Sequence, residues 1–402
     1  MINLLIAQSG GPTAAINASL SGIAAAALAG GRVNRIYGGI NGIKGILDGK
    51  IKEIGPALAS AENLELLALT PASALGTCRF KLDDKPETYD RIIAEMRKFD
   101  ITHFIYIGGN DSMDTVTKLS RHCAANGGPV ITGVPKTIDN DLCVMDHTPG
   151  FGTAAKYIAL TLAECFRDVA VYDFPQVAIF ETMGRHAGWL AAASCLAGIN
   201  GGDSPHLIYL PEAPLDEKQF IQDIKNQMKK TPYALVVVSE GVKDANGVYI
   251  CEKEGERGID AFNHKLLSGA GNYLGRIVTA ELGCKVRNID LSLSQRCSAH
   301  AASRCDIDEA KLLGAAALSR ALEGASGQLP VLERVSDEPY KIKIEFTDAA
   351  NVANLEKKVP RDWLNEAGNN VNKKMIDYLR PLIQGECPVK YRNGVPVHIK
   401  LY

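Results

Sequence analysis

Short apolar runs alternate with stretches of helical periodicity along most of this chain. Strand-like runs occupy residues 2–7, 32–37, 102–109, 129–134, 176–181, 206–212 and 233–241. Apolar residues recur at helical spacing in 13–29, 111–128, 153–168 and 216–230. This alternation is typical of βαβ units, in which a helix connects two parallel strands. Because the strand-like runs are almost continuously apolar, we predict that helices cover both faces of the sheet.

The 402 residues exceed the usual size of a single hydrophobic core. Two domains, or one domain with large insertions, are therefore expected. No shift in composition and no low-complexity linker marks a boundary, and the best candidate is the loop at 147–152, HTPGFG, before a long helical stretch. The chain from 328 onward is more charged and includes the hairpin-like segment YKIKIEF (340–346), which we interpret as peripheral.

Charge and cysteine content exclude several classes of protein. Lys and Arg total 44 against 46 Asp and Glu, so no net basic field favours nucleic acid or a membrane surface. The N-terminal apolar run lacks a basic segment and fits a first strand better than a signal peptide, and no apolar run is long enough to span a bilayer. Ten cysteines without a CxxC pair, and eight histidines without HExxH, predict a cytoplasmic protein with reduced thiols and no structural zinc.

Polar residues and glycines gather directly after the apolar runs. In an open parallel sheet, ligands bind beyond the carboxyl ends of the strands, so these segments are the candidates for chemistry. Core packing alone would not require polar residues at every strand end. The segments are SGGPTAAIN (9–17), GGNDSMDT (108–115), PKTIDND (135–141), ETMGRHAG (181–188), PE (211–212) and SEG (239–241).

The first two segments each place glycines before a predicted helix. In SGGPTAAIN, backbone N–H groups and the helix N-terminus would suit an anion, although a tight turn explains the glycines equally well. The segment is neither a P-loop nor GxGxxG. In GGNDSMDT, helix capping needs only one of Asn110, Asp111 and Ser112, so two polar side chains remain unexplained.

PKTIDND has the most specific chemistry. Asp139 and Asp141 suit a metal with its waters, or a base beside a metal ligand, while Lys136 and Thr137 suit a phosphate. An Asx-turn would explain one aspartate only. Arginines at 185, 287 and 296 would suit a sugar phosphate, although a surface ion pair is the plain alternative for each. Anion cradles, paired carboxylates and arginines together favour phosphoryl transfer.

These residues resemble the phosphofructokinase family. SGGPTAAINA, ALGTCRF (74–80), GGNDS, PKTIDND, MGR and SLSQR occur in the family's order between residues 9 and 296. The resemblance implies an α/β fold of two similar doubly wound, mostly parallel sheet domains with the active site in the cleft between them. It implies a phosphoryl-donor domain of 1–150 plus about 295–350, and a fructose 6-phosphate domain of 151–294 plus about 351–402.

The resemblance also implies roles for individual residues. Asp139 would be the base that takes the proton of the sugar's 1-hydroxyl, with Arg185, Lys136 and Asp111 as further catalytic residues. Asn110 and Asp141 would bind Mg²⁺. The implied donor site consists of Gly11, Arg79, Asp111, Ser112 and Lys136. The implied sugar-phosphate site consists of Thr137, Ile138, Asp139, Met183, Gly184, Arg185, Glu212, Arg287 and Arg296, with Glu240 as a further candidate.

Two positions predict the phosphoryl donor. Members of the family that use ATP have glycine where this chain has Asp111 and Lys136, whereas the pyrophosphate users resemble this sequence at both. A carboxylate at 111 would repel the α-phosphate of ATP, and a lysine at 136 would neutralise compact pyrophosphate. We therefore expect reversible transfer from pyrophosphate to fructose 6-phosphate.

The alternatives are an ATP-dependent kinase, a kinase for another ketose phosphate and a catalytically silent sugar-phosphate binding subunit. A dinucleotide oxidoreductase is disfavoured because GxGxxG is missing.

Three positions depart from the family's pattern. Asn110 stands where many members have a metal-binding aspartate. Gln176 stands where bacterial ATP enzymes carry an arginine that reaches the sugar phosphate of a neighbouring subunit, and Leu293 replaces a polar contact. The family's dimers and tetramers imply a homodimer or homotetramer here, and no nucleotide activator site is evident.

Overall fold

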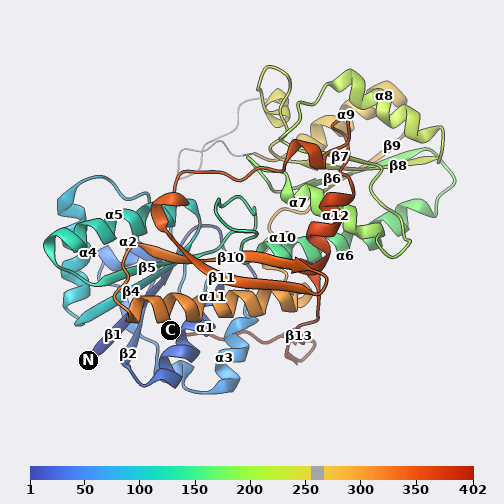
Figure 1. Ribbon diagram of the computed structural model, residues 1–402. Coiled ribbons are helices and arrows are strands. Elements are labelled where there is room, and N and C mark those ends of the chain that lie inside the picture. The colour runs from blue at the N-terminus through green and yellow to red at the C-terminus, as the bar shows by residue number, and fades with distance from the viewer. Residues whose placement is uncertain (255–266) are drawn as a thin grey trace.

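Two parallel sheets form the frame of the molecule in the computed structural model, which describes residues 1–254 and 267–402 (Figure 1). The first sheet has the strand order β3-β2-β1-β4-β5, in which β3 alone runs antiparallel to its neighbour. Its strands are β1 (Ile2–Gln8), β2 (Val33–Gly39), β3 (Ile51–Glu53), β4 (Ile101–Gly108) and β5 (Val130–Pro135). The second sheet has the all-parallel order β7-β8-β6-β9. Its strands are β6 (Gln176–Thr182), β7 (Leu207–Tyr209), β8 (Tyr233–Ser239) and β9 (Lys285–Asp290).

Helices cover both faces of the sheets, as the continuous apolar runs predict. The central residues of β1, β4, β6 and β8 are buried because no face of these strands meets water. Two predicted helices are α1 (Ile16–Gly30), which begins three residues later than expected, and α5 (Asn110–Asn126). The remaining helices that flank the sheets are α2 (Gly42–Leu47), α3 (Ala61–Ala68), α4 (Pro86–Arg97), α6 (Phe151–Ala170), α7 (Trp189–Ala193), α8 (Glu217–Met228) and α9 (Ala270–Leu282). In the described part of the chain, no helix is long and apolar enough to cross a membrane.

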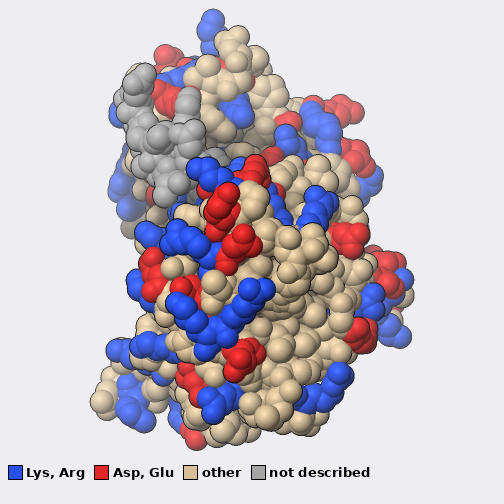
Figure 2. All heavy atoms as spheres, turned by 90° about the vertical axis from the view of Figure 1, so that its left-hand side faces the viewer, with Lys and Arg blue, Asp and Glu red and all other residues tan. Residues whose placement is uncertain are grey.

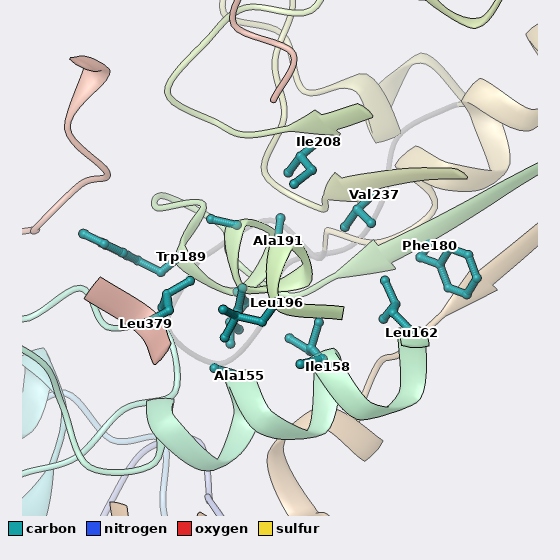
Figure 3. Packing of buried hydrophobic residues seen from close by; sticks show 14 of the residues in the cluster. Ala155, Ile158, Leu162, Phe180, Trp189, Ala191, Leu196, Ile208, Val237 and Leu379 are labelled. Atoms are coloured by element: carbon teal, nitrogen blue, oxygen red, sulfur yellow. The ribbon is translucent and has the colours of Figure 1, made fainter. Parts of the chain in front are cut away.

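The core of the second sheet is built largely on α6. Ala155, Ile158 and Leu162 point from one face of this helix toward the sheet (Figure 3). Phe166, on the same helix, meets Phe180 of β6 edge to face with the ring centres 5.3 Å apart. The spacing of these residues at three and four positions is the helical periodicity seen in the sequence.

After the second sheet the chain returns to the first. Helix α10 (Ser294–Cys297) leads to α11 (Arg304–Leu322), which packs along α1. A two-stranded antiparallel hairpin follows, β10 (Gln328–Asp337) and β11 (Tyr340–Asp348), confirming that 340–346 belongs to a hairpin. The interpretation of this region as peripheral is wrong for β10, because Leu329 and Val331 are buried in the core of the first sheet.

The last segment of the chain divides between the two sheets. Helix α12 (Lys373–Leu379) packs against the second sheet, where 351–402 was expected to lie. Ile399 and Leu401 instead pack on the apolar cluster of the first sheet, and Figure 1 shows both chain ends at that sheet. Figure 2 shows acidic and basic side chains intermixed over one face of the molecule, in keeping with the formal charge of −2.

A buried cluster of charges joins the hairpin to the loop after β5. The His147 ring lies between two carboxylates, with Nδ1 2.7 Å from Asp146 Oδ2 and Nε2 2.6 Å from Glu309 Oε2. Arg334 of β10 donates to Asp146 Oδ2 at 2.9 Å, and Tyr340 of β11 donates to Glu309 Oε1 at 2.7 Å. Burial alone would lower the pKa of His147, but its hydrogen bonds with both carboxylates outweigh burial and raise that pKa to about 9.

This arrangement predicts a pH-dependent contribution of His147 to stability. Because the folded-state pKa lies above the ordinary value of 6.5, the stabilisation is complete below about pH 6.5 and is lost as pH rises through about 9. We expect His147→Gln to lower the free energy of unfolding most at pH 6 and progressively less toward pH 9.5. Denaturant unfolding at several pH values measures this difference. Exposed His398→Gln is the control, and a wild-type-to-variant difference that is constant with pH would contradict the prediction.

Candidate active site

A cleft of about 820 Å³ lies between the two sheets and is lined from both. Strand order in the first sheet reverses between β1 and β4, and the loops after these strands open into this cleft, as expected for an α/β fold. The cleft is lined by residues 9–12, Arg79, Lys81, 109–112, 136–139, Asp141, Met183, 185–187, Glu240, Leu267, Leu293, Arg296 and 354–356. The structure thus brings most of the sequence-predicted site residues together.

The turn after β1 forms one wall with the lysine of the loop after β5. Gly10 has a positive φ of 78°, and its carbonyl accepts a hydrogen bond of 2.7 Å from Thr77 Oγ1. The Gly11 carbonyl accepts a hydrogen bond of 2.6 Å from Lys136 Nζ. The Lys136 side chain is therefore buried with its ammonium group fixed beside the glycine turn.

The N-terminus of α5 forms the adjoining wall. Asp111 and Ser112 both line the cleft in the first turn of this helix, next to the backbone N–H groups that the helix leaves unpaired. Asn110 was expected to bind metal, but both atoms of its amide are already engaged. Its Nδ2 donates to Leu355 O at 2.7 Å, and its Oδ1 accepts from the backbone N–H of Asn354. Asn110 therefore holds residues 354–355. Its Oδ1 keeps a second lone pair, so its role in metal binding stays a prediction.

The loop after β5 turns its two aspartates toward the cleft. Asn140, between them, has a left-handed backbone with φ 53° and a fully buried side chain. Its Nδ2 donates to Tyr378 Oη at 2.9 Å, and its Oδ1 accepts from the Thr148 N–H at 3.2 Å. With Asn140 directed inward, Asp139 and Asp141 both line the cleft.

Burial perturbs the ionisation of this loop. It raises the pKa of Asp141 to about 7, with the Asp139 charge acting in the same direction. Burial also raises the pKa of Asp139, although Lys136 and Arg185 oppose that rise. Burial lowers the pKa of Lys136 to about 8, partly offset by Asp139. Perturbed groups of opposite charge that share one cleft are typical of a catalytic site.

The second sheet supplies the opposite wall. Met183 N–H donates to Gln295 Oε1 at 3.1 Å. Gly184 has φ 128° and a carbonyl that accepts from Ser239 Oγ at 2.5 Å, so this turn requires glycine and presents Arg185 to the cleft. Burial, with a contribution from the Asp139 charge, raises the pKa of Glu240 to about 8.

Several predicted residues lie outside the cleft lining in the described part of the chain. Glu212 Oε1 accepts backbone hydrogen bonds from Gly188 at 3.0 Å and Val359 at 2.9 Å, so the carboxylate joins these two segments. Arg287 lies on the edge strand β9, and Gly184 shapes its turn without lining the cleft. Gln176 is fully buried at the start of β6, whereas Leu293 lies in the cleft and is 56% exposed.

Sequence reasoning missed part of the cleft. Residues 354–356 line it without belonging to any recognised motif, because they follow the hairpin that seemed peripheral. His186 and Lys81 also line the cleft. His186 directly follows Arg185, and Lys81 lies two residues after Arg79. Their closeness to these two predicted residues was the only sign of them in the sequence.

The assembled groups suit phosphorylated ligands. Arg79, Lys136, Arg185 and Arg296 bring positive charge from both sheets into one cleft. Among the described residues no cluster of three His, Cys, Asp or Glu side chains could hold a metal on its own. Mg²⁺ does not need such a cluster, since it is usually held by one or two carboxylates with water and substrate phosphates. The half-buried Asp139 and Asp141 fit that description.

Comparison with known proteins agrees with this geometry. The family model described as Phosphofructokinase matches residues 3–320. The pyrophosphate--fructose 6-phosphate 1-phosphotransferase of Xanthomonas campestris pv. campestris is 41% identical over 406 residues, covering 99% of this chain and 96% of the relative. Its counterpart in Halomonas elongata is 40% identical with the same coverage. The crystal structure of a pyrophosphate-dependent phosphofructokinase from Nitrosospira multiformis superposes with a TM-score of 0.89 at 36% identity, covering 99% of this chain and 96% of that one. The chain therefore belongs to the phosphofructokinase family.

Proposed function

We propose that this enzyme transfers a phosphoryl group from pyrophosphate to the 1-hydroxyl of fructose 6-phosphate, giving fructose 1,6-bisphosphate and phosphate. The observation that carries the proposal is the placement of Asp139, Lys136 and Asp111 on one cleft. Full-length relatives that are named for this reaction support it. The reaction is reversible because the bond broken in the donor and the bond formed in the product are similar in energy.

Asp139 acts as the base. The 1-hydroxyl oxygen attacks the phosphorus atom of pyrophosphate, its proton passes to the Asp139 carboxylate, and the bridging P–O bond breaks to release phosphate. Burial raises the pKa of Asp139 and so makes its carboxylate a stronger base than an exposed aspartate. Arg185 lies on the same cleft, where its guanidinium stabilises the charge of the transferred group.

The donor side favours a compact anion. Lys136 is fixed by its hydrogen bond to Gly11 O, so its charge stands at one defined point of the cleft. Asp111 and Ser112 at the start of α5, together with Arg79 and Gly11, complete the donor site. The carboxylate of Asp111 repels a longer polyphosphate whose further phosphate would approach it.

Mg²⁺ is the metal that this chemistry requires, and Asp141 is the residue that we assign to it. When bound, the ion neutralises charge on the pyrophosphate oxygens. Its coordination would be completed by water, by pyrophosphate oxygens and by the second lone pair of Asn110 Oδ1.

The acceptor site combines residues of both sheets. Thr137, Ile138, Met183, Arg185, Glu240 and Arg296 line the cleft on this side. We also propose a donor domain around the first sheet and a sugar-phosphate domain around the second, in a cytoplasmic homodimer or homotetramer. Sedimentation equilibrium distinguishes those assemblies from a monomer.

Asp139→Asn tests the base. We expect kcat to fall by about 10²–10⁴ because the amide cannot accept the hydroxyl proton. Steady-state rates with pyrophosphate, Mg²⁺ and fructose 6-phosphate measure the change. Asp173→Asn, the same substitution at an exposed site, is the control. An unchanged kcat in Asp139→Asn would remove the base assignment.

Asp111→Gly combined with Lys136→Gly tests the donor. We expect kcat/KM for pyrophosphate to fall and kcat/KM for ATP to rise, because the repelling carboxylate and the fixed ammonium are both removed. The two single variants show which residue carries more of the preference. If the ratio of the two kcat/KM values stays at its wild-type level, these residues do not select the donor.

Asp141→Asn tests the metal site. We expect the Mg²⁺ concentration for half-maximal activity to rise by at least about tenfold, the scale on which even an indirect contact to a metal acts. Activity measured against free Mg²⁺ gives this value. A fall in kcat at unchanged Mg²⁺ dependence would place the metal elsewhere.

A further inference from the structure

Residues 354–357, which we call the strap, contact three of the recognised motifs in turn. The strap follows the β10–β11 hairpin and crosses from the first sheet toward the second. No motif identifies it in the sequence, and three of its four residues line the cleft. Its contacts show how the separate strand-end loops are held relative to one another.

The first half of the strap lies on the start of α5. Asn110 bonds Leu355 O at 2.7 Å and the Asn354 N–H, and Asn354 Nδ2 donates to Asp114 Oδ1 at 3.4 Å. These contacts fix the strap beside Asp111, on the donor side of the cleft.

The next residue reaches the opposite wall. Glu356 forms a hydrogen bond with the ring of His186, which directly follows Arg185 in the turn after β6. Both side chains are more than a third exposed, so this pair adds little stability by itself. It does link the strap to the acceptor side.

Lys357 holds the loop that carries Asp139. Its side chain is half-buried, and its Nζ donates to Asp146 O at 2.7 Å, Asn140 Oδ1 at 3.2 Å and Met145 O at 3.3 Å. Its backbone N–H donates to Asp141 O at 2.7 Å. Every one of these acceptors lies within 140–146, so a single residue binds the loop at both ends.

The same lysine is anchored from the second sheet. Trp189 Nε1 donates to Lys357 O at 3.0 Å, and the ammonium lies 5.2 Å from the centre of the Trp189 ring. Trp189 begins α7, in the core of the second sheet. Lys357 therefore connects the loop of the first sheet to a rigid element of the second.

We propose that Lys357 is a positioning residue for phosphoryl transfer, acting through Asn140 to set the direction of Asp139. This proposal rests on the proposed role of Asp139 as base. Asn140 is the left-handed residue between the two aspartates, and its amide oxygen is one of the groups that Lys357 holds. Without the ammonium, the buried amide and two carbonyl oxygens lose a charged donor, and the loop relaxes.

The test compares Lys357→Met, which keeps the length and apolar stem of the side chain, with Lys358→Met at its exposed neighbour. We expect kcat to fall by about 10²-fold in Lys357→Met, the effect of a misplacement of about 1 Å in a reacting group. KM for both substrates should stay near the wild-type values, because the groups that bind them are unchanged. Lys358→Met should behave as wild type.

A double-mutant cycle with Asn140→Gly tests the route. Glycine accepts the left-handed backbone but removes the amide that Lys357 holds. If Lys357 acts through Asn140, the doubly substituted enzyme is no slower than the slower single variant. If Lys357→Met does not fold, Asn140→Gly alone must still lower kcat at constant KM.

Three results would overturn the proposal. These are an unchanged kcat in Lys357→Met, a rise in KM without a fall in kcat, and rate losses that multiply in the double variant. Asp139→Asn is measured in parallel. If Asp139→Asn retains full activity, the assignment of Asp139 as base fails. The kcat of Lys357→Met still shows, separately, whether Lys357 affects the rate.

Discussion

A charged group that is buried away from water needs a partner of opposite charge or a hydrogen bond. The loop after β5 contains several such groups close together. The segment 136–141 contains Lys136, Asp139 and Asp141. Burial lowers the pKa of the lysine and raises the pKa of both aspartates, so it favours the neutral form of each. Each charge is tolerated because the opposite charge stands nearby. The Gly11 carbonyl in the turn after β1 accepts a hydrogen bond from Lys136. The positive charge of Arg185, on the opposite wall, opposes the rise in the pKa of Asp139.

The surrounding structure keeps these charges at fixed positions. Asn140 directs its own side chain into the protein, where Tyr378 and Lys357 hold it, and the aspartates on either side are left facing the cleft. Behind that loop, His147 and two carboxylates form a second buried set of charges that includes the hairpin through Arg334. Catalysis by positioning requires such rigidity, because the reacting groups must already stand where charge develops.

Sequence reasoning succeeded where a residue's chemistry and its place at a strand end coincide. The apolar runs predicted the parallel sheets, and their carboxyl ends predicted Asp139, Lys136, Asp111 and Arg185 in one cleft. It could not foresee contacts that depend on distant chain segments. Asn110 bonds to residues more than two hundred positions away, so no local pattern shows that it anchors them. Glu212 is a second example, since its backbone partner Val359 lies 147 positions away.

The chain passes between the two sheets more than once. It crosses in the loop before α6, again between β9 and α11, a third time along the strap, and finally after α12, when the tail returns to Ile399 and Leu401 on the first sheet. A single connection would act as a hinge and allow the two halves to swing freely. Several connections at different points restrict such rotation, since each must bend in concert. A break in any one crossing would therefore leave the two halves still tied together by the other three.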